Sequence, residues 1–203
     1  MLLRKILSRG LSVLRRFLSL YYRLRFRLYA GSLRSCHLTA RPHFDVPVKV
    51  RGGGSLKIGK VRFGYYLAPK CGNGEIELQP RTIDSCISIG DGTVLANNVF
   101  VCANERIEIG ANCLVGEQVQ FFDANFHEVA PDKRNQCDPS APVIIEDNVW
   151  IANRCMILKG VTIGRNSVVC AMSLVNKSIP PSSLVAGVPA RVICSIKCLS
   201  KEN

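Results

Sequence analysis

Apolar residues recur at every sixth position through the second half of the chain. The first series runs without a break through Ile145, Ile151, Ile157, Ile163, Val169 and Val175. A second series follows four residues behind and holds Val149, Cys155, Val161, Ser167, Ser173 and Ile179, which are small or β-branched. An α-helix would bring its apolar positions round every three or four residues, and a strand alternates every two. A period of six therefore predicts short strands and turns, three to a coil of about 18 residues, with coils about 4.8 Å apart.

The same repeat occurs earlier in the chain. One run holds Ile89, Leu95, Val101 and Ile107, and another, offset by two residues, holds Ile109, Val115 and Phe121. Four Ile-Gly dipeptides mark turn corners, where glycine relieves crowding: Ile58-Gly59, Ile89-Gly90, Ile109-Gly110 and Ile163-Gly164. The repeat is irregular between Val48 and Ile87, as expected of an end coil. The pattern predicts an all-β domain, a parallel β-helix, over residues 45–195.

One interruption breaks the repeat. The rhythm stops after Phe121 and resumes at Ile145, and the residues between, 122–143, are rich in charge, proline and asparagine. This composition predicts a loop extruded from the coil. Long loops on a regular scaffold are usually functional, so we expect an active site here.

Helical periodicity dominates the first residues instead. One face holds Leu3, Leu7, Leu11, Leu14, Leu18, Tyr21 and Leu28, and the opposite face holds Lys5, Arg9, Arg16, Arg23 and Arg27. This pattern predicts a basic amphipathic helix of about 25 residues, although Arg25 falls on its apolar side. We expect residues 1–34 to contact an anionic membrane surface. Packing of the helix on its own trimer or on another protein is the alternative. The predicted organisation is helix and linker over 1–44, β-helix over 45–195, and a C-terminal tail over 196–203.

The charge distribution argues against nucleic acid as a partner. The chain has 203 residues and a net charge of +12. Residues 1–44 hold ten Lys and Arg and no acid, which leaves 17 basic and 15 acidic side chains for the remainder. The positive charge therefore belongs to the N-terminal segment, and the repeat region is nearly neutral.

Cysteine and hydropathy patterns predict the compartment. The ten cysteines are scattered without a CxxC pair, which favours reduced thiols in a cytoplasmic protein. The three histidines show no metal-ligand spacing, so no metal is expected. Arg or Lys interrupts the N-terminus every few residues, and no apolar stretch of about 18 residues occurs, so neither a signal peptide nor a membrane-spanning helix is expected. We expect a cytoplasmic protein, peripheral at the inner face of the membrane.

The predicted loop contains the sequence Asp123-Ala124-Asn125-Phe126-His127. A neutral imidazole can act as a general base towards a hydroxyl. Asp123 and Asn125 are near enough in sequence to fix its tautomer. A single histidine in a loop is also typical of a solvent-facing or structural position, so the pattern alone leaves both interpretations open.

This stretch and the residues after it resemble the hexapeptide-repeat acetyltransferases. The sequence is most similar to sugar O-acetyltransferases of the maltose, galactoside and nodulation type, and to acyltransferases of lipopolysaccharide and capsule biosynthesis. The resemblance covers about residues 50–195 and implies a left-handed helix, a homotrimer, and acetyl-CoA bound between subunits. The motifs that carry it are Asp123-x-Asn125-Phe126-His127, Pro142-Val143-x-Ile145-x-Asp147-Asn148-Val149-Trp150-Ile151, Ile157-Leu158-Lys159-Gly160-Val161-Thr162-Ile163-Gly164, Ile179-Pro180-Pro181 and Ala186-Gly187-Val188-Pro189-Ala190-Arg191.

The resemblance also implies roles for single residues. His127 matches the catalytic base. The positions matching the pantetheine arm are Ala152, Asn153 and Ala171; those matching the nucleotide end of coenzyme A are Asn176, Lys177 and Arg191; and the candidates for binding the acceptor are Asn97 and Asn104. The family often has glycine where Ala152 and Cys170 stand. Turn packing is the alternative for Ala152 and Ala171, and a solvated corner is the alternative for Lys177.

The favoured function is O-acetylation of a sugar hydroxyl, in a surface polysaccharide or its lipid-linked precursor. A membrane helix suits a lipid-linked acceptor. N-acetylation of an amino-sugar nucleotide would use the same fold and base but would not call for such a helix. A metal hydrase would need three histidine ligands on adjacent coils, and only His127 lies in the repeat region. A trimeric scaffold without enzymatic activity is the non-enzymatic alternative.

Overall fold

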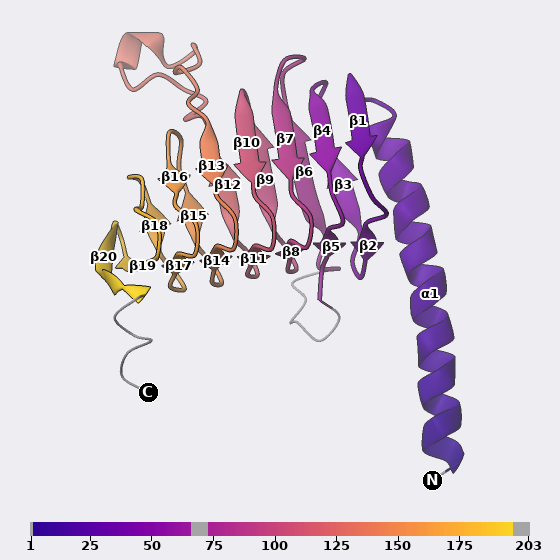
Figure 1. Ribbon diagram of the computed structural model, residues 1–203. Helices are drawn as coiled ribbons and strands as arrows, with labels where there is room; N and C mark the ends of the chain where they lie inside the picture. Colours follow the sequence, from indigo (N-terminus) through magenta and orange to yellow (C-terminus); the bar gives the residue numbers. More distant parts are fainter. Residues whose placement is uncertain (1, 66–72, 197–203) are drawn as a thin grey trace.

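Three parallel sheets wind around one another as a left-handed β-helix, with a single long helix, α1 (Leu2–Ala30), at its N-terminal end (Figure 1). The structure is a computed structural model and describes residues 2–65 and 73–196. Each coil contributes one strand to each sheet in turn. A loop with a short 3-10 helix, η1 (Pro131–Lys133), projects from one edge.

The strands of each sheet are stacked in chain order. The first sheet holds β1 (Ser35–Leu38), β4 (Ser55–Ile58), β7 (Cys86–Ile89), β10 (Arg106–Ile109), β13 (Val143–Ile145) and β16 (Thr162–Ile163). The second holds β2 (His43–Phe44), β5 (Arg62–Phe63), β8 (Val94–Leu95), β11 (Leu114–Val115), β14 (Trp150–Ile151), β17 (Val168–Val169), β19 (Ser183–Gly187) and β20 (Ala190–Ser195). The third holds β3 (Val48–Val50), β6 (Ile76–Pro80), β9 (Phe100–Ala103), β12 (Gln120–Phe122), β15 (Met156–Ile157) and β18 (Leu174–Val175).

The strand register confirms the period of six and the coil of three strands. Ile145 pairs with Ile163 in the first sheet, and Ile157 pairs with Val175 in the third, so each step spans 18 residues. In an earlier coil Ile89 pairs with Ile109, a step of 20 residues. The two extra residues explain the offset between the two earlier runs of the repeat.

The repeat positions fill the interior of the coils. The first series, from Ile145 to Val175, is almost completely buried, and so is the second series, from Val149 to Ile179. Strand residues between them face outward because successive side chains of a strand point to opposite sides. Cys155 of the second series and Cys113, at the equivalent position of an earlier coil, are buried thiols, and the cysteines of the described residues are free.

Left-handed backbone conformations form the corners. Residues with φ near +60° recur every six positions where the chain turns: Asn112 and Gln118 in one run, and Asn148, Arg154, Asn166 and Met172 in the next, with Gly160 between Arg154 and Asn166. Asparagine tolerates this conformation better than most residues do. The glycine of an Ile-Gly corner has a different role, since a Cβ on Gly90 would lie 2.7 Å from backbone atoms of the next coil.

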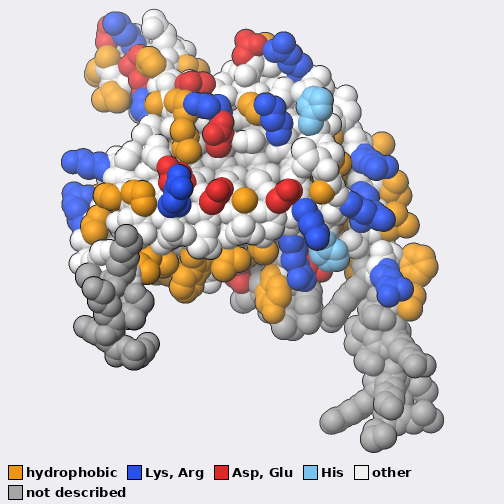
Figure 2. Space-filling model, viewed as in Figure 1, with side chains coloured by type: hydrophobic (Ala, Val, Ile, Leu, Met, Phe, Trp, Pro, Cys, Tyr) orange, Lys and Arg blue, Asp and Glu red, His pale blue; other side chains and the backbone are white. Residues whose placement is uncertain are grey.

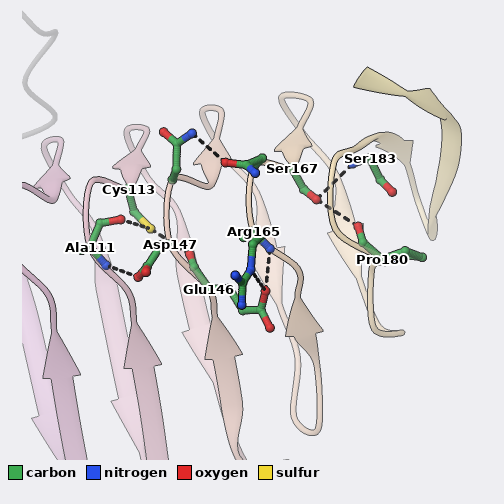
Figure 3. A network of polar contacts seen from close by, with 10 residues as sticks. Ala111, Cys113, Glu146, Asp147, Arg165, Ser167, Pro180 and Ser183 are labelled. Atoms are coloured by element: carbon green, nitrogen blue, oxygen red, sulfur yellow. Dashed lines mark hydrogen bonds and ion pairs between the residues drawn. The ribbon is translucent and has the colours of Figure 1, made fainter. Parts of the chain in front are cut away.

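Polar groups at the corners connect each coil to the next (Figure 3). The Asp147 carboxylate accepts a hydrogen bond from the backbone N–H of Ala111 at 2.7 Å. The Ser167 hydroxyl donates to the carbonyl of Pro180 and accepts from the N–H of Ser183. These contacts satisfy backbone groups that the two-residue strands leave unpaired, and so they fix the stacking of the coils.

The second half of α1 closes the N-terminal end of the β-helix. Phe26 is 1% exposed and packs against the rings of Phe44 and Phe63. Arg25, which the amphipathic pattern placed on the apolar side, forms an ion pair with Glu75 at 2.7 Å. The helix therefore packs on its own domain, a contact that neither the membrane prediction nor the alternative of packing on a trimer or another protein included.

The predicted apolar face of α1 is not the face that packs. Leu14, Leu18, Tyr21 and Leu28 are exposed, together with Phe17 and Leu24. The helix thus has a second apolar surface, on its outer side. None of the described helical segments combines the length and hydrophobicity needed to span a bilayer.

The prediction of a linker up to residue 44 is wrong. Ser35–Leu38 and His43–Phe44 form β1 and β2 of the first coil, which begins ten residues before the predicted start at 45. The repeat is hidden there because β1 is half-buried at an end coil, where only one neighbouring coil requires an apolar partner. At the other end β20 pairs antiparallel with β19 and ends at Ser195. The predicted tail, except for residue 196, lies outside the described residues.

Candidate active site

The projecting loop, residues 123–142, begins at a buried carboxylate. Asp123 is fully buried, and its two oxygens accept hydrogen bonds from the backbone N–H groups of Asn104, Glu105 and Arg106 at 2.7–2.8 Å. This carboxylate therefore anchors the loop to the corner between β9 and β10. The expectation that Asp123 orients the His127 imidazole is not what the structure shows, because the backbone of this corner occupies both oxygens.

A second contact fastens the loop to a later coil. Asp138 accepts a hydrogen bond from the side-chain amide of Asn125 and forms an ion pair with Lys159. The Lys159 ammonium also donates to the carbonyl of Pro139 at 3.0 Å. The hydrogen bond from Lys159 lowers the pKa of Asp138, which keeps this carboxyl group ionised at neutral pH. Asn125 thus holds the two ends of the loop together and makes this contact instead of one to His127.

His127 is exposed on this loop, with one ring nitrogen engaged. Its Nδ1 lies 2.8 Å from the backbone carbonyl oxygen of Arg134. A carbonyl can only accept, so Nδ1 carries the hydrogen and Nε2 of the neutral ring is left with its lone pair. The imidazole is therefore held in the tautomer that a general base requires.

Aromatic and cationic side chains support the turn before His127. Phe126 has φ of 64°, a conformation that is uncommon for a bulky residue. The Arg81 guanidinium lies over its ring at 4.7 Å, and Phe122 contacts it edge-on at 6.1 Å. These contacts hold Phe126 in place and so direct the neighbouring His127.

The candidate coenzyme A residues lie on two different edges of the β-helix. Ala152, Asn153 and Ala171 are at corners between the second and third sheets, and Asn153 and Ala171 occupy equivalent positions 18 residues apart. The Asn153 side chain is engaged there, since its oxygen accepts from the N–H of Glu117 at 3.0 Å. Asn176 and Lys177 are exposed on the corner after β18, which leads from the third sheet back towards the first. The loop leaves the β-helix at this same kind of corner.

Arg191 and the two acceptor candidates, Asn97 and Asn104, also lie in different parts of the β-helix. Arg191 is exposed on β20, and its guanidinium donates to the carbonyl of Ala190. Asn97 is fully buried at the edge of Ala152, where its side-chain oxygen accepts from the N–H of Tyr65 at 3.0 Å. Asn104 is half-buried at the base of the loop. Within one chain the loop that carries His127 therefore starts at the corner of Asn104, and Asn97 lies on a separate edge.

Three contributors to this site escaped the sequence analysis. They are the carbonyl of Arg134, the carboxylate of Asp138 and the ammonium of Lys159. Lys159 belongs to a motif of the resemblance, which could have suggested it. A backbone carbonyl and a lone loop acid have no signal in the sequence. In the described part of the chain, no three His, Cys, Asp or Glu side chains form a group able to hold a metal ion.

Two family models of repeated hexapeptides match the chain. "Bacterial transferase hexapeptide (six repeats)" matches residues 142–177, and "Hexapeptide repeat of succinyl-transferase" matches residues 82–103. Hexapeptide repeats of the kind found in these transferases are therefore recognised on both sides of the loop. The first match runs from the end of the loop to the corner that holds Lys177, and the second covers the coil of β7, β8 and β9, so both lie on coils of the β-helix.

Known proteins similar to this chain are named as acetyltransferases. A galactoside O-acetyltransferase of Escherichia coli K12 is 39% identical over 119 residues, 58% of this chain and 58% of that protein. The putative lipopolysaccharide biosynthesis O-acetyl transferase WbbJ of the same organism is 30% identical over 118 residues, 53% of this chain and 59% of that protein. The chain thus spans somewhat over half the length of these relatives.

A solved structure extends the similarity to a bound ligand. The hexapeptide-repeat acetyltransferase VCA0836 of Vibrio cholerae, complexed with acetyl coenzyme A, is 42% identical with a TM-score of 0.52. The comparison covers 54% of this chain and 60% of that one. The similarity supports the family and leaves the ligand and the reaction of the present chain to be proposed.

Proposed function

We propose that this protein is an acetyl-CoA-dependent O-acetyltransferase acting on a sugar hydroxyl, with His127 as the catalytic base. The observation that carries the proposal is the hydrogen bond from Nδ1 of His127 to the carbonyl of Arg134 on an exposed loop, because it places the lone pair of the neutral ring on Nε2. The acetyltransferase names of similar proteins support the reaction class. Acetyl-CoA is supported by the complex of VCA0836.

The proposed acetyl transfer requires the movement of one proton and an imidazole that is held in a fixed orientation. In the proposed reaction Nε2 of His127 removes the proton of a sugar hydroxyl, and the hydroxyl oxygen forms a bond to the acetyl carbon. Acetyl-CoA supplies that acetyl group as a thioester. The carbon–sulfur bond breaks, and His127 returns the proton to the departing sulfur. The carbonyl of Arg134 keeps its hydrogen bond throughout and stabilises the imidazolium while the proton is held.

We further propose that the working unit is a homotrimer in which neighbouring copies complete the site. The outward residues of the first sheet include Lys57, Ser88 and Glu108, which are polar. On the second sheet Leu114 and Trp150 are neighbours in register, and both are half exposed. Figure 2 shows hydrophobic side chains gathered along the lower edge of the β-helix, below a band of charged ones. An apolar face of this kind suits contact between subunits, which would bring the two edges of the candidate site together.

The nucleotide end of acetyl-CoA provides a test of the proposed cofactor residues. Replacing Lys177 or Arg191 with alanine should raise the KM for acetyl-CoA by about 5- to 50-fold, with a smaller change in kcat, because each removes one exposed charge-assisted phosphate contact. Steady-state kinetics measures both constants. Lys57→Ala removes a charge from a different sheet and should leave the KM unchanged. Unchanged KM values for both Lys177→Ala and Arg191→Ala would contradict their assignment.

The proposed acceptor is a surface polysaccharide or its lipid-linked precursor. The proposed location of the protein is peripheral, at the cytoplasmic face of the membrane. The name of WbbJ, which includes lipopolysaccharide biosynthesis, supports the polysaccharide. The exposed apolar outer side of α1 supports the membrane location, since such a helix can lie in the headgroup region.

Mass spectrometry of surface glycans tests the function directly. Glycans from cells that contain the protein should carry acetyl groups that are missing from cells without it. Mild alkali should remove these groups, because it cleaves O-acetyl esters and leaves N-acetyl amides intact. Identical glycans in the two kinds of cell would contradict the function, and alkali-resistant acetyl groups would point to N-acetylation.

A further inference from the structure

A basic pocket lies between α1 and the first two coils, at the N-terminal end of the β-helix. It has a volume of about 550 Å³. Its charged lining consists of Arg16 and Arg23 from α1, Arg41 and His43 from the first coil, and Asp45 and Arg62 beneath them. Figure 2 shows basic side chains gathered over α1 and the neighbouring coils, at the right of the view.

The positive charge of this pocket is not neutralised within the chain. Its one carboxylate, Asp45, is already engaged by Arg62 at 2.6 Å and by His43 at 3.2 Å. Among the described residues, no acidic side chain forms an ion pair with Arg16, Arg23 or Arg41. The guanidinium groups of Arg16, Arg23 and Arg41 therefore share a pocket whose one carboxylate is already paired with other residues. An anion is the ligand that such a pocket lacks.

Arg23 gives a second, independent indication. Its Nε is buried and has no hydrogen-bond partner in the described part of the chain. Burial and the nearby charges of Arg41 and Arg27 lower the pKa of the Arg23 guanidinium. A buried donor without a partner is costly unless a ligand satisfies it.

An apolar groove continues from the basic pocket. It has a volume of about 580 Å³ and shares Leu20, Arg23 and Arg41 with the pocket. Its apolar lining comes from Leu24 and Phe26 of α1 and from Leu38, Ala40, Pro42 and Phe44 of the first coil. Arginines thus stand where a charged hollow meets a hydrophobic one. This arrangement suits a molecule with a phosphate at one end and a hydrocarbon chain at the other.

We infer that this pocket and groove bind the phosphate headgroup and part of an acyl chain of an anionic membrane phospholipid. Arg23 and Arg41 would hold the phosphate, and Arg16 would add charge at the rim. The exposed outer side of α1, with Leu14, Leu18 and Leu28, would lie against the surrounding lipid. This inference rests on the membrane location proposed above, and acetyl transfer to a soluble acceptor does not depend on it.

Vesicle binding by the full chain tests the inference. The protein should sediment with vesicles of phosphatidylcholine containing phosphatidylglycerol, and not with phosphatidylcholine alone. The double variant Arg23→Gln/Arg41→Gln should weaken this binding by about 10- to 30-fold. The matched control Lys57→Gln/Lys60→Gln removes two charges from the same end of the molecule, outside the pocket, and should bind like the original. The single variant Arg41→Gln changes only an exposed residue. Weaker vesicle binding by this variant would therefore not be explained by a folding defect of the kind that the double variant could have.

Each further outcome decides for or against the lipid. Equal loss of binding in both double variants would show a general charge effect, and no loss in either would show that Arg23 and Arg41 do not hold the lipid. Either result would overturn the pocket. Release from vesicles by millimolar inorganic phosphate or glycerol phosphate would mean that the pocket takes a free phosphate. A change of oligomeric state in Arg23→Gln/Arg41→Gln, measured by sedimentation equilibrium, would assign the surface to a second copy of the chain. Acetylation of a soluble sugar by the same variants should be unchanged, which separates this inference from the proposed reaction.

Discussion

His127→Ala is expected to reduce turnover by about 10²–10⁴-fold, the usual contribution of a positioned general base. Its imidazole is exposed and contributes one hydrogen bond, to the carbonyl of Arg134, so the fold should tolerate the change. Steady-state kinetics with acetyl-CoA and the best acceptor found would measure the loss. Calorimetric titration should show that acetyl-CoA still binds.

His37→Ala is the matched control for this experiment. His37 is exposed on β1, far along the chain from the loop, and its removal should leave turnover unchanged. If His127→Ala keeps more than about a tenth of the original kcat, then His127 is not the base. In that case the loop would have to be abandoned as the active site.

Asp123→Ala is expected to lower the free energy of unfolding by about 3–5 kcal/mol, because it leaves the backbone N–H groups of Asn104, Glu105 and Arg106 without their buried acceptor. Thermal or denaturant unfolding of the full chain measures this change. Asp123→Asn should also destabilise, since an amide can present only one oxygen to three donors. Asp132→Ala, on the exposed η1 of the same loop, should change stability by less than about 0.5 kcal/mol.

Asp123→Ala and Asp123→Asn together distinguish two roles for Asp123. An anchor for the corner predicts that stability and activity fall together. An orienting partner of His127 predicts a loss of turnover with stability unchanged. Asp123→Asn with normal unfolding and greatly reduced kcat would therefore restore the orienting role and contradict the structural one.

The repeat could be read from the sequence because every inward position of a coil meets the same requirement. Ile145, Ile163 and their neighbours face a narrow interior that accepts only apolar or small side chains, so the period of six appears directly in the sequence. The loop was visible for the opposite reason, since its residues are free of this requirement. The first coil was missed because β1 has a neighbouring strand on one side only.

The contacts of the loop could not be predicted in the same way. Asp123 binds a corner 17 to 19 residues earlier, and Asp138 binds Lys159, 21 residues later. Neither distance has a periodic signal, because each depends on how the loop folds back over the coils. Proximity in sequence favoured Asp123 as the partner of His127, while the structure assigns that contact to a backbone carbonyl.

The amphipathic pattern of α1 was correct as a pattern and incomplete as a guide to packing. The helix carries Leu14, Leu18 and Tyr21 on one side, and a smaller apolar surface around Phe26 on another. The amphipathic pattern emphasises the larger apolar surface. The end of the β-helix packs against the smaller one, where the ring of Phe26 contacts Phe44 and Phe63. Shape complementarity at a coil end decides this choice, and periodicity does not record it.

The position of α1 also bears on how the molecule avoids polymerising. A β-helix ends in open strand edges, and the first coil of one molecule could in principle stack on the last coil of another and continue without limit. α1 covers β2 and β3 at one end. At the other end β20 runs antiparallel to β19, against the direction that a further coil would require. Both ends of the solenoid are thereby closed to head-to-tail growth, and association is directed to its sides.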